Sequence, residues 1–312
     1  MRTRSASSVV MSLVGVVGLS ALTVVAAPGV SQAAKVKPPP PYYLSLGDSY
    51  SVGYQPGLGA TAGYTAVVAQ KEKMQLENFG CGGATSDSLL TAIGCVESGY
   101  GPVAATDAVA YPTETQEQAA LDFIAANPGK VGLITVSIGG NDITSCVNAG
   151  DNSAITACVL ANAATVEANV LTLGTALRSA LNASDDPAAA IVGLTYPDVI
   201  LGDYVFPAGS PNPTLAQLSV TAFKDIVNPD LDAAYTNSAV DGTFVDVTKA
   251  TDGYKALKHL VTLAPYGLIP EPVAKVCELT YYCTLGNIHA NTTGYDFIGK
   301  LAAKAAKKDH AA

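Results

Sequence analysis

Short apolar segments alternate with longer helical patterns along most of this chain, and this alternation limits the possible folds more than any other feature. The apolar segments are residues 42–46, 76–79, 131–138, 188–194 and 243–247. The helical patterns are residues 64–74, 113–126, 153–181, 214–227 and 291–308. Strands that alternate with helices indicate βαβ units, in which parallel strands form a sheet and helices cover both faces. The sequence therefore predicts a single α/β domain, residues 42–308, with a mostly parallel sheet.

The first 33 residues have the layout of a secretory signal peptide. Arg2 and Arg4 form a basic start, residues 9–25 are apolar, and residues 31–33 (Ser-Gln-Ala) fit a small-x-small cleavage site. Cleavage behind this site predicts a secreted, extracellular protein with no stable membrane anchor. An uncleaved anchor is the alternative, because the apolar stretch is long. No later segment has the ~20 consecutive apolar residues of a spanning helix.

Residues 34–41 are rich in Lys and Pro and predict an extended leader, and residues 309–312 predict a disordered tail. Removal of residues 1–33 takes away two arginines and no acid, which changes the net charge from −9 to −11. The mature chain is strongly acidic and has no basic cluster except a short Lys-rich C-terminus. Such a chain is not expected to bind the negatively charged phosphate backbone of a nucleic acid. We therefore expect no nucleic-acid partner.

Six cysteines follow the proposed signal peptide, and an even number in an exported chain favours disulfides. Six cysteines allow 15 connectivities. Their spacing makes three local pairs the simplest proposal: Cys81–Cys95, Cys146–Cys158 and Cys277–Cys283. The chain has no Cys-x-x-Cys pair and only three histidines, which argues against a zinc site. We expect neither a metal nor a cofactor.

The first apolar segment ends at Gly47-Asp48-Ser49-Tyr50. A strand that ends in this way presents the Ser49 hydroxyl at the carboxyl edge of the sheet, where α/β proteins hold their ligands. Gly47 permits a sharp turn at that point. The alternative is a serine that only caps a helix or closes a turn.

The next two strands also end in candidate site residues. Gly83 follows the second strand and Asn141 follows the third. In acyl transfer, a nucleophile needs a base and hydrogen-bond donors aimed at the developing oxyanion. The backbone N–H groups of Ser49 and Gly83 and the Asn141 amide would supply three donors. The alternative interpretation is that Gly83 and Asn141 simply belong to ordinary turns.

Three histidines are candidates for the base. His310 lies in the Lys-rich tail, and His259 lies in an ordinary amphipathic segment. His289 comes just before the last helix and shortly after a cysteine pair, so its loop is better fixed in space. A histidine with its ordinary pKa of ~6.5 predicts activity that fades below about pH 6.

These four motifs together resemble the GDSL family of SGNH hydrolases. Gly47-Asp48-Ser49-Tyr50 resembles its first block, residues 81–85 its glycine block, residues 139–142 (Gly-Gly-Asn-Asp) its third block, and His289 its final histidine. The resemblance covers essentially the whole mature chain. It implies a flavodoxin-like three-layer αβα sandwich and the hydrolysis of lipid, acyl or acetylated-sugar esters. The three local cysteine pairs resemble the secreted actinobacterial lipases and esterases of this family.

One departure from the family pattern concerns the histidine. The family usually has Asp three residues before it, whereas this chain has Gly286. The Nδ1–H of the imidazole still needs an acceptor, so that Nε2 can face the serine. The chain resembles family members with a Ser-His dyad, and we expect the carbonyl of Gly286, or one beside it, to orient His289. The alternative is that a carboxylate from elsewhere in the chain orients His289.

Taken together, these features predict a monomeric carboxylic ester hydrolase, a lipase or esterase that acts through an acyl-enzyme on a small-molecule or lipid ester. Two alternatives remain. One is a carbohydrate acetylesterase on the same fold. The other is an inactive module that binds cell walls or glycans, although such a module has no chemical need for Ser49, Asn141 and His289 together.

Overall fold

The central sheet has five parallel strands in the order β4-β1-β5-β6-β7. These strands are β1 (Tyr42–Gly47), β4 (Gln75–Asn78), β5 (Val131–Ser137), β6 (Ala190–Leu194) and β7 (Thr243–Val245). In chain order the sheet reads 2-1-3-4-5, which is the flavodoxin-like order. The computed structural model describes residues 39–60, 63–95, 104–106 and 108–309. The parallel sheet that the alternation predicts is confirmed.

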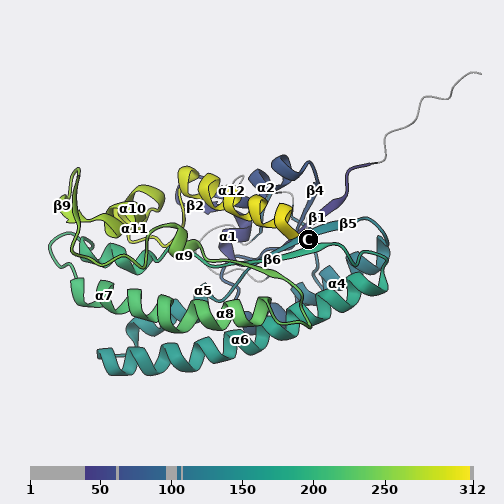
Figure 1. The fold of residues 1–312 in the computed structure, drawn as a ribbon, viewed down its shortest axis with the longest axis horizontal. Coiled ribbons are helices and arrows are strands. Elements are labelled where there is room, and N and C mark those ends of the chain that lie inside the picture. The colour runs from purple at the N-terminus through teal and green to yellow at the C-terminus, as the bar shows by residue number, and fades with distance from the viewer. Residues whose placement is uncertain (1–38, 61–62, 96–103, 107, 310–312) are drawn as a thin grey trace, which may run out of the picture. The chain divides into compact units, whose positions relative to one another are not determined.

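Helices cover both faces of this sheet (Figure 1). One face carries α2 (Tyr64–Glu72) and α12 (Thr292–Asp309), and the other carries α4 (Gln116–Ala126), α6 (Asn152–Ala183) and α8 (Asn228–Tyr235). Successive residues of a strand point to opposite faces. Tyr43 therefore packs in the core under α2 and α12, and Leu44 packs in the core under α6. The predicted three-layer αβα fold is confirmed.

The remaining elements connect these layers and form an additional region after β7. They are α1 (Ser49–Val52), β2 (Tyr54–Gln55), β3 (Gly59–Ala60), α3 (Ser86–Thr91), α5 (Gly140–Thr144), η1 (Ser145–Asn148), η2 (Val199–Tyr204), α7 (Pro213–Ala222), η3 (Phe223–Val227), α9 (Val247–Ala250), β8 (Leu260–Leu263), β9 (Gly267–Pro270), α10 (Glu271–Leu279) and α11 (Tyr282–Leu285). η1 and η2 are 3₁₀ helices, and η3 is a π-helical turn that joins α7 to α8.

Helix α6 is the one helix in the described part of the chain whose length and composition would let it cross a membrane. It lies instead along the sheet, with Val166, Val170 and Leu177 buried in the core. Arg178 of this helix is also buried and donates hydrogen bonds to the carbonyls of Val240 (2.9 Å) and Ala189 (3.0 Å). These contacts make α6 a core helix of this fold.

The two ends of the chain bear on the predicted boundaries. Residues 1–33, with the expected signal peptide, lie outside the described residues, as do residues 34–38 of the leader. Helix α12 runs to Asp309, one residue into the predicted tail, and residues 310–312 lie outside the description. All three predicted disulfides are present: Cys81–Cys95, Cys146–Cys158 and Cys277–Cys283.

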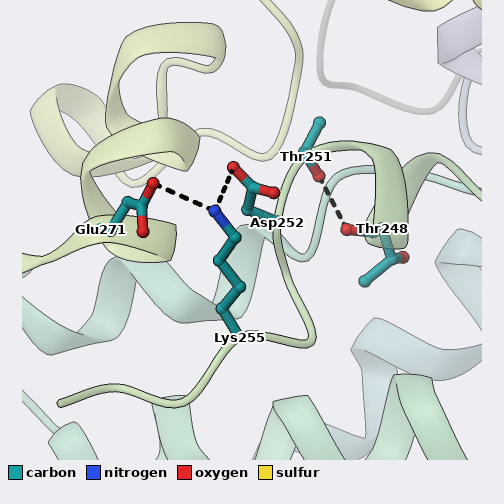
Figure 2. A network of polar contacts seen from close by, with 5 residues as sticks. All are labelled: Thr248, Thr251, Asp252, Lys255 and Glu271. Atoms are coloured by element: carbon teal, nitrogen blue, oxygen red, sulfur yellow. Dashed lines mark hydrogen bonds and ion pairs between the residues drawn. The ribbon is translucent and has the colours of Figure 1, made fainter. Parts of the chain in front are cut away.

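A surface network joins the end of α9 to the start of α10 (Figure 2). Lys255 Nζ lies 3.2 Å from Asp252 and 3.0 Å from Glu271, which is in the first turn of α10. Beside it, the Thr251 hydroxyl donates to the carbonyl of Thr248 at 3.1 Å. Through α10, this network is connected to the loop that carries His289.

Candidate active site

Ser49 lies at the carboxyl end of β1, where the order of the sheet reverses between β4 and β5. Gly47 has φ +133°, and a Cβ there would overlap the carbonyl oxygen of Ser137 in β5, so the turn requires glycine. The Asp48 carboxylate caps α1 by accepting the N–H of Tyr50 at 2.9 Å. Asp48 thus performs the capping that was the alternative role for Ser49, whose hydroxyl is left for another partner.

That partner is His289, whose Nε2 lies 2.7 Å from Ser49 Oγ. The histidine loop is held to the end of α10 by two backbone hydrogen bonds, from Tyr281 N to His289 O (3.0 Å) and from Asn291 N to Leu279 O (2.9 Å). The Cys277–Cys283 disulfide closes the same region. A nucleophile and a base 240 residues apart are therefore brought together by α10, α11 and their disulfide.

Of the other two histidines, only His259 is described by the structure, and it has no hydrogen bond to Ser49. His259 is exposed just before β8, and its carbonyl accepts the N–H of Glu271. His310 lies outside the described residues.

The acceptor on His289 Nδ1 is the side chain of Asn287, at 2.8 Å from its Oδ1. The same Oδ1 accepts the backbone N–H of His289 at 3.1 Å. Because that N–H can only donate, the oxygen of the amide must face it, and Nδ1 then carries the ring proton. Nε2 keeps its lone pair for the proton of Ser49.

This arrangement differs from the expectation that the backbone carbonyl of Gly286, or one beside it, orients the ring, because the acceptor is a side-chain oxygen. Gly286 instead ends α11 with φ +62°, and its N–H donates to Tyr282 O at 2.7 Å. The sequence held a signal for the actual acceptor, since an Asn side chain often bonds the backbone two residues further on. Asn287 is two residues before His289.

Aromatic rings surround the imidazole of His289. The Tyr54 ring meets it edge to face at 4.6 Å, and the Tyr50 ring lies at 6.0 Å. Tyr50 also donates its hydroxyl to the carbonyl of Ile288 at 2.6 Å. This burial lowers the pKa of His289 from 6.5 to about 4. With this pKa a neutral histidine persists to more acidic pH, so the loss of activity is expected at a lower pH than 6.

Asn141 lines the same cavity as Ser49, in the first turn of α5. Its Nδ2 donates to the carbonyl of Ala84 at 2.8 Å, which links it to the loop that contains Gly83. Gly83 has φ +82° at an exposed position of this loop, and with Cys81 it lines a different cavity from the one that contains Ser49. Ser49, Gly83 and Asn141 thus lie in the segments that follow three adjacent strands, and Ser49 and Asn141 share one cavity.

A second contact joins the same two loops. Asp142 accepts hydrogen bonds from Ser86 N (3.0 Å) and Ser86 Oγ (2.8 Å), and Asn169 of α6 donates to the same Ser86 hydroxyl (3.0 Å). Asp142 therefore connects the start of α5, which carries Asn141, to the start of α3, which follows the Gly83 loop.

Asp48 is a buried carboxyl group whose role the sequence did not predict. Besides capping α1, it accepts the hydroxyl proton of Tyr196 at 2.7 Å. Burial raises the pKa of Asp48 to about 7. Its hydrogen bonds go to Tyr50 and Tyr196, whereas the ring of His289 is bonded to Asn287 and Ser49.

Chemically, the arrangement is a hydroxyl, an oriented neutral base and amide donors at one edge of a sheet, which are the groups that acyl transfer requires. Within the described residues, no three His, Cys, Asp or Glu side chains are grouped so as to hold a metal ion.

Comparisons with known proteins indicate the family and the fold of this chain. The model of a family described as GDSL-like lipase/acylhydrolase matches residues 43–302. The chain is similar in fold to the lipase Lip_vut3 from a goat rumen metagenome, with 15% identity, a TM-score of 0.52, and coverage of 85% of this chain and 96% of that one. None of the curated proteins matches the chain in sequence.

Two further solved structures are similar at lower TM-scores. The extracellular lipase of Streptomyces rimosus is 20% identical over 76% of this chain and 98% of its own, with a TM-score of 0.42. The acetylxylan esterase Axe2 of Geobacillus stearothermophilus is 13% identical over 85% and 94%, with a TM-score of 0.42.

Proposed function

Because this chain belongs to the GDSL-like lipase/acylhydrolase family, we propose that it hydrolyses carboxylic esters with Ser49 as nucleophile and His289 as general base. The observation that carries the proposal is the 2.7 Å contact between Ser49 Oγ and His289 Nε2. A resting hydrogen bond of this length puts the proton of the serine within reach of the base. Asn287 is the positioning residue, since it holds the tautomer that the base needs.

The reaction begins when Ser49 Oγ attacks the ester carbonyl carbon and its proton passes to His289 Nε2. The Nδ1–H of the resulting imidazolium stays bonded to Asn287 Oδ1. The oxyanion of the tetrahedral intermediate is held by the N–H groups of Ser49 and Gly83 and by the Asn141 amide. His289 then protonates the leaving alcohol, and an acyl-enzyme remains. Water, activated by the same histidine, releases the acid and restores Ser49.

We also propose that the protein works outside the cell as a monomer, after cleavage behind Ala33. Three disulfides support this location, because such bonds form and persist in oxidising compartments.

The test is to label the mature protein with a fluorophosphonate, which reacts with activated serines, and to measure the hydrolysis of p-nitrophenyl acetate. Wild type and Ser179→Ala should be labelled and active, because Ser179 is exposed on α6 and distant in the chain from the site loops. Ser49→Ala should lose both signals. Folded wild-type protein that neither labels nor hydrolyses the ester would overturn the proposal and favour a glycan-binding module.

A further inference from the structure

The side chain of Tyr50 joins the loop of the nucleophile to the loop of the base. Tyr50 directly follows Ser49, and its hydroxyl donates a hydrogen bond of 2.6 Å to the carbonyl of Ile288. Ile288 is the residue directly before His289. One hydrogen bond therefore connects the neighbour of Ser49 with the neighbour of His289, across a sequence separation of 238 residues.

The ring of Tyr50 is held firmly at its own end. The backbone N–H of this residue donates to the Asp48 carboxyl group at 2.9 Å, and Tyr50 is only 4% exposed. The rings of Tyr196 and Tyr295 meet it edge to face, with centroids 4.8 Å and 5.6 Å away. Edge-to-face contacts are a preferred arrangement of aromatic pairs and stabilise it. Tyr50 is therefore a rigid spacer between α1 and the histidine loop.

Other hydrogen bonds attach both ends of the histidine segment to the chain just after α1. Gln55 Oε1, in β2, accepts the hydroxyl of Tyr281 at 3.0 Å and that of Thr292 at 3.1 Å. These two partners lie before and after His289, whereas the bond of Tyr50 is made next to His289 itself. Loss of the Tyr50 hydroxyl would thus leave the segment attached at its ends and would release the part that carries the base.

The distance between the two loops matters because proton transfer from the serine depends on it. Asn287 orients the imidazole through Nδ1, but it belongs to the same loop and cannot fix how far that loop lies from Ser49. The bond from Tyr50 acts between the loops and supplies this constraint. A displacement of about 1 Å can lower a rate ~10²-fold. Without the hydroxyl, the partly buried carbonyl of Ile288 would also lose this donor.

From these contacts we propose that Tyr50 is a positioning residue, whose hydroxyl holds the histidine loop at the distance from Ser49 that proton transfer requires. This inference rests on the proposed function, since it concerns the same serine and histidine. The ring of Tyr50 also lines the cavity of Ser49, and phenylalanine would keep that wall. Removal of the hydroxyl alone should therefore lower kcat and leave KM unchanged.

The experiment compares Tyr50→Phe with Tyr266→Phe. Each variant removes a hydroxyl that donates to a backbone carbonyl, and the partner of Tyr266 is Cys283 O, 2.9 Å away in α11. In Tyr50→Phe, kcat for p-nitrophenyl acetate should fall about tenfold with KM within twofold, and fluorophosphonate labelling should slow by a similar factor. Tyr266→Phe should stay within about twofold of wild type in all three quantities. Equal losses in the two variants, or an unchanged kcat in Tyr50→Phe, would overturn the inference.

A second pair of variants keeps the inference testable if Tyr50→Phe does not fold. Position 50 can carry p-aminophenylalanine, which still has an N–H donor, or p-methylphenylalanine, which has a similar shape without one. The amino variant should keep kcat within about threefold of wild type, and the methyl variant should lose about tenfold. Equal kcat values in this pair would contradict the proposal.

The outcomes also separate this inference from the proposed function. If wild type hydrolyses esters and Tyr50→Phe is equally active, only the positioning role of Tyr50 is rejected. Failure of folded wild type on every ester would reject the proposed function itself.

Discussion

Two polar networks lie on either side of α10 along the chain, one at the start of this helix and one at the histidine loop, and they differ mainly in their exposure to water. The Lys255 network is open: the side chains of Lys255, Asp252 and Glu271 are 46%, 35% and 42% exposed (Figure 2). The network of Asn287, His289 and Ser49 is enclosed, and His289 is only 8% exposed. The open network holds full charges, whereas the enclosed one has no ionised member.

The difference shows that burial, more than the number of contacts, decides what such a network can do. Water screens the ion pairs of Lys255, and exposed pairs of this kind contribute little to stability. Around His289, the rings of Tyr50 and Tyr54 exclude water, so the charged imidazolium is disfavoured. The neutral amide oxygen of Asn287 orients the ring. It does not stabilise the buried imidazolium as a carboxylate would.

The largest effect should come from removing the base. His289→Ala should lower kcat/KM on the order of 10⁴-fold or more, because members of such a catalytic unit do not act independently. Steady-state hydrolysis of p-nitrophenyl esters measures the loss, with the exposed His259→Ala as control. A His289→Ala variant within tenfold of wild type would exclude the proposed role.

The next effect concerns how the ring is held. Asn287→Leu keeps the approximate size of the side chain but removes the acceptor of Nδ1–H, and kcat/KM should fall about 10²-fold with little change in KM. Asn287→Asp restores an acceptor and should keep most of the activity. Two results together would instead support a carboxylate that orients His289. An alanine substitution at a single Asp elsewhere would abolish turnover as fully as His289→Ala, and Asn287→Leu would stay near wild type.

The pH profile sharpens the comparison further. A pKa of about 4 for His289 means that the neutral base persists as the pH falls, so the acid limb of kcat/KM should have its midpoint near pH 4 rather than 6.5. In Asn287→Asp, the new carboxylate favours the imidazolium and should move this midpoint upward by about 1–3 units. An acid limb near 6.5 in wild type would show that burial does not control this histidine.

The smallest effect is expected in the open network. Lys255→Ala removes both ion pairs of Figure 2, yet it should leave kcat/KM within twofold and lower Tm by less than about 2 °C. Thermal unfolding and ester hydrolysis measure the two quantities. A loss of activity like that of Asn287→Leu would mean that the network positions the histidine loop.

The parts of the fold with a clear hydrophobic periodicity, or with a clear motif at the end of a strand, were predictable from the sequence. The strand before Ser49 and the long helix α6 follow their patterns within one or two residues. Helix α4 begins at Gln116, three residues later than its pattern, because Thr115 is the residue that caps it. Helix α3 has only six residues, Ser86–Thr91, and belongs to none of the predicted helical patterns.

The region from α9 to α11 was not predictable in the same way. The β8–β9 hairpin exposes Leu260 and Leu268, so its strands lack the alternation of a buried face. Helix α10 has only nine residues and starts at Glu271 and Pro272, too short for a reliable helical period. These elements nevertheless carry the loop of His289.

The sequence by itself determined the parallel sheet, the local disulfides, and the choice of Ser49 and His289 as candidates, because these depend on local periodicity, short spacings and residue chemistry. The tertiary structure decided that Asn287 rather than Gly286 holds the ring, since that choice depends on the conformation of a loop. It also decided the low pKa of His289. That shift arises where the distant residues Tyr50 and Tyr54 exclude water from the ring, and no local pattern encodes that exclusion.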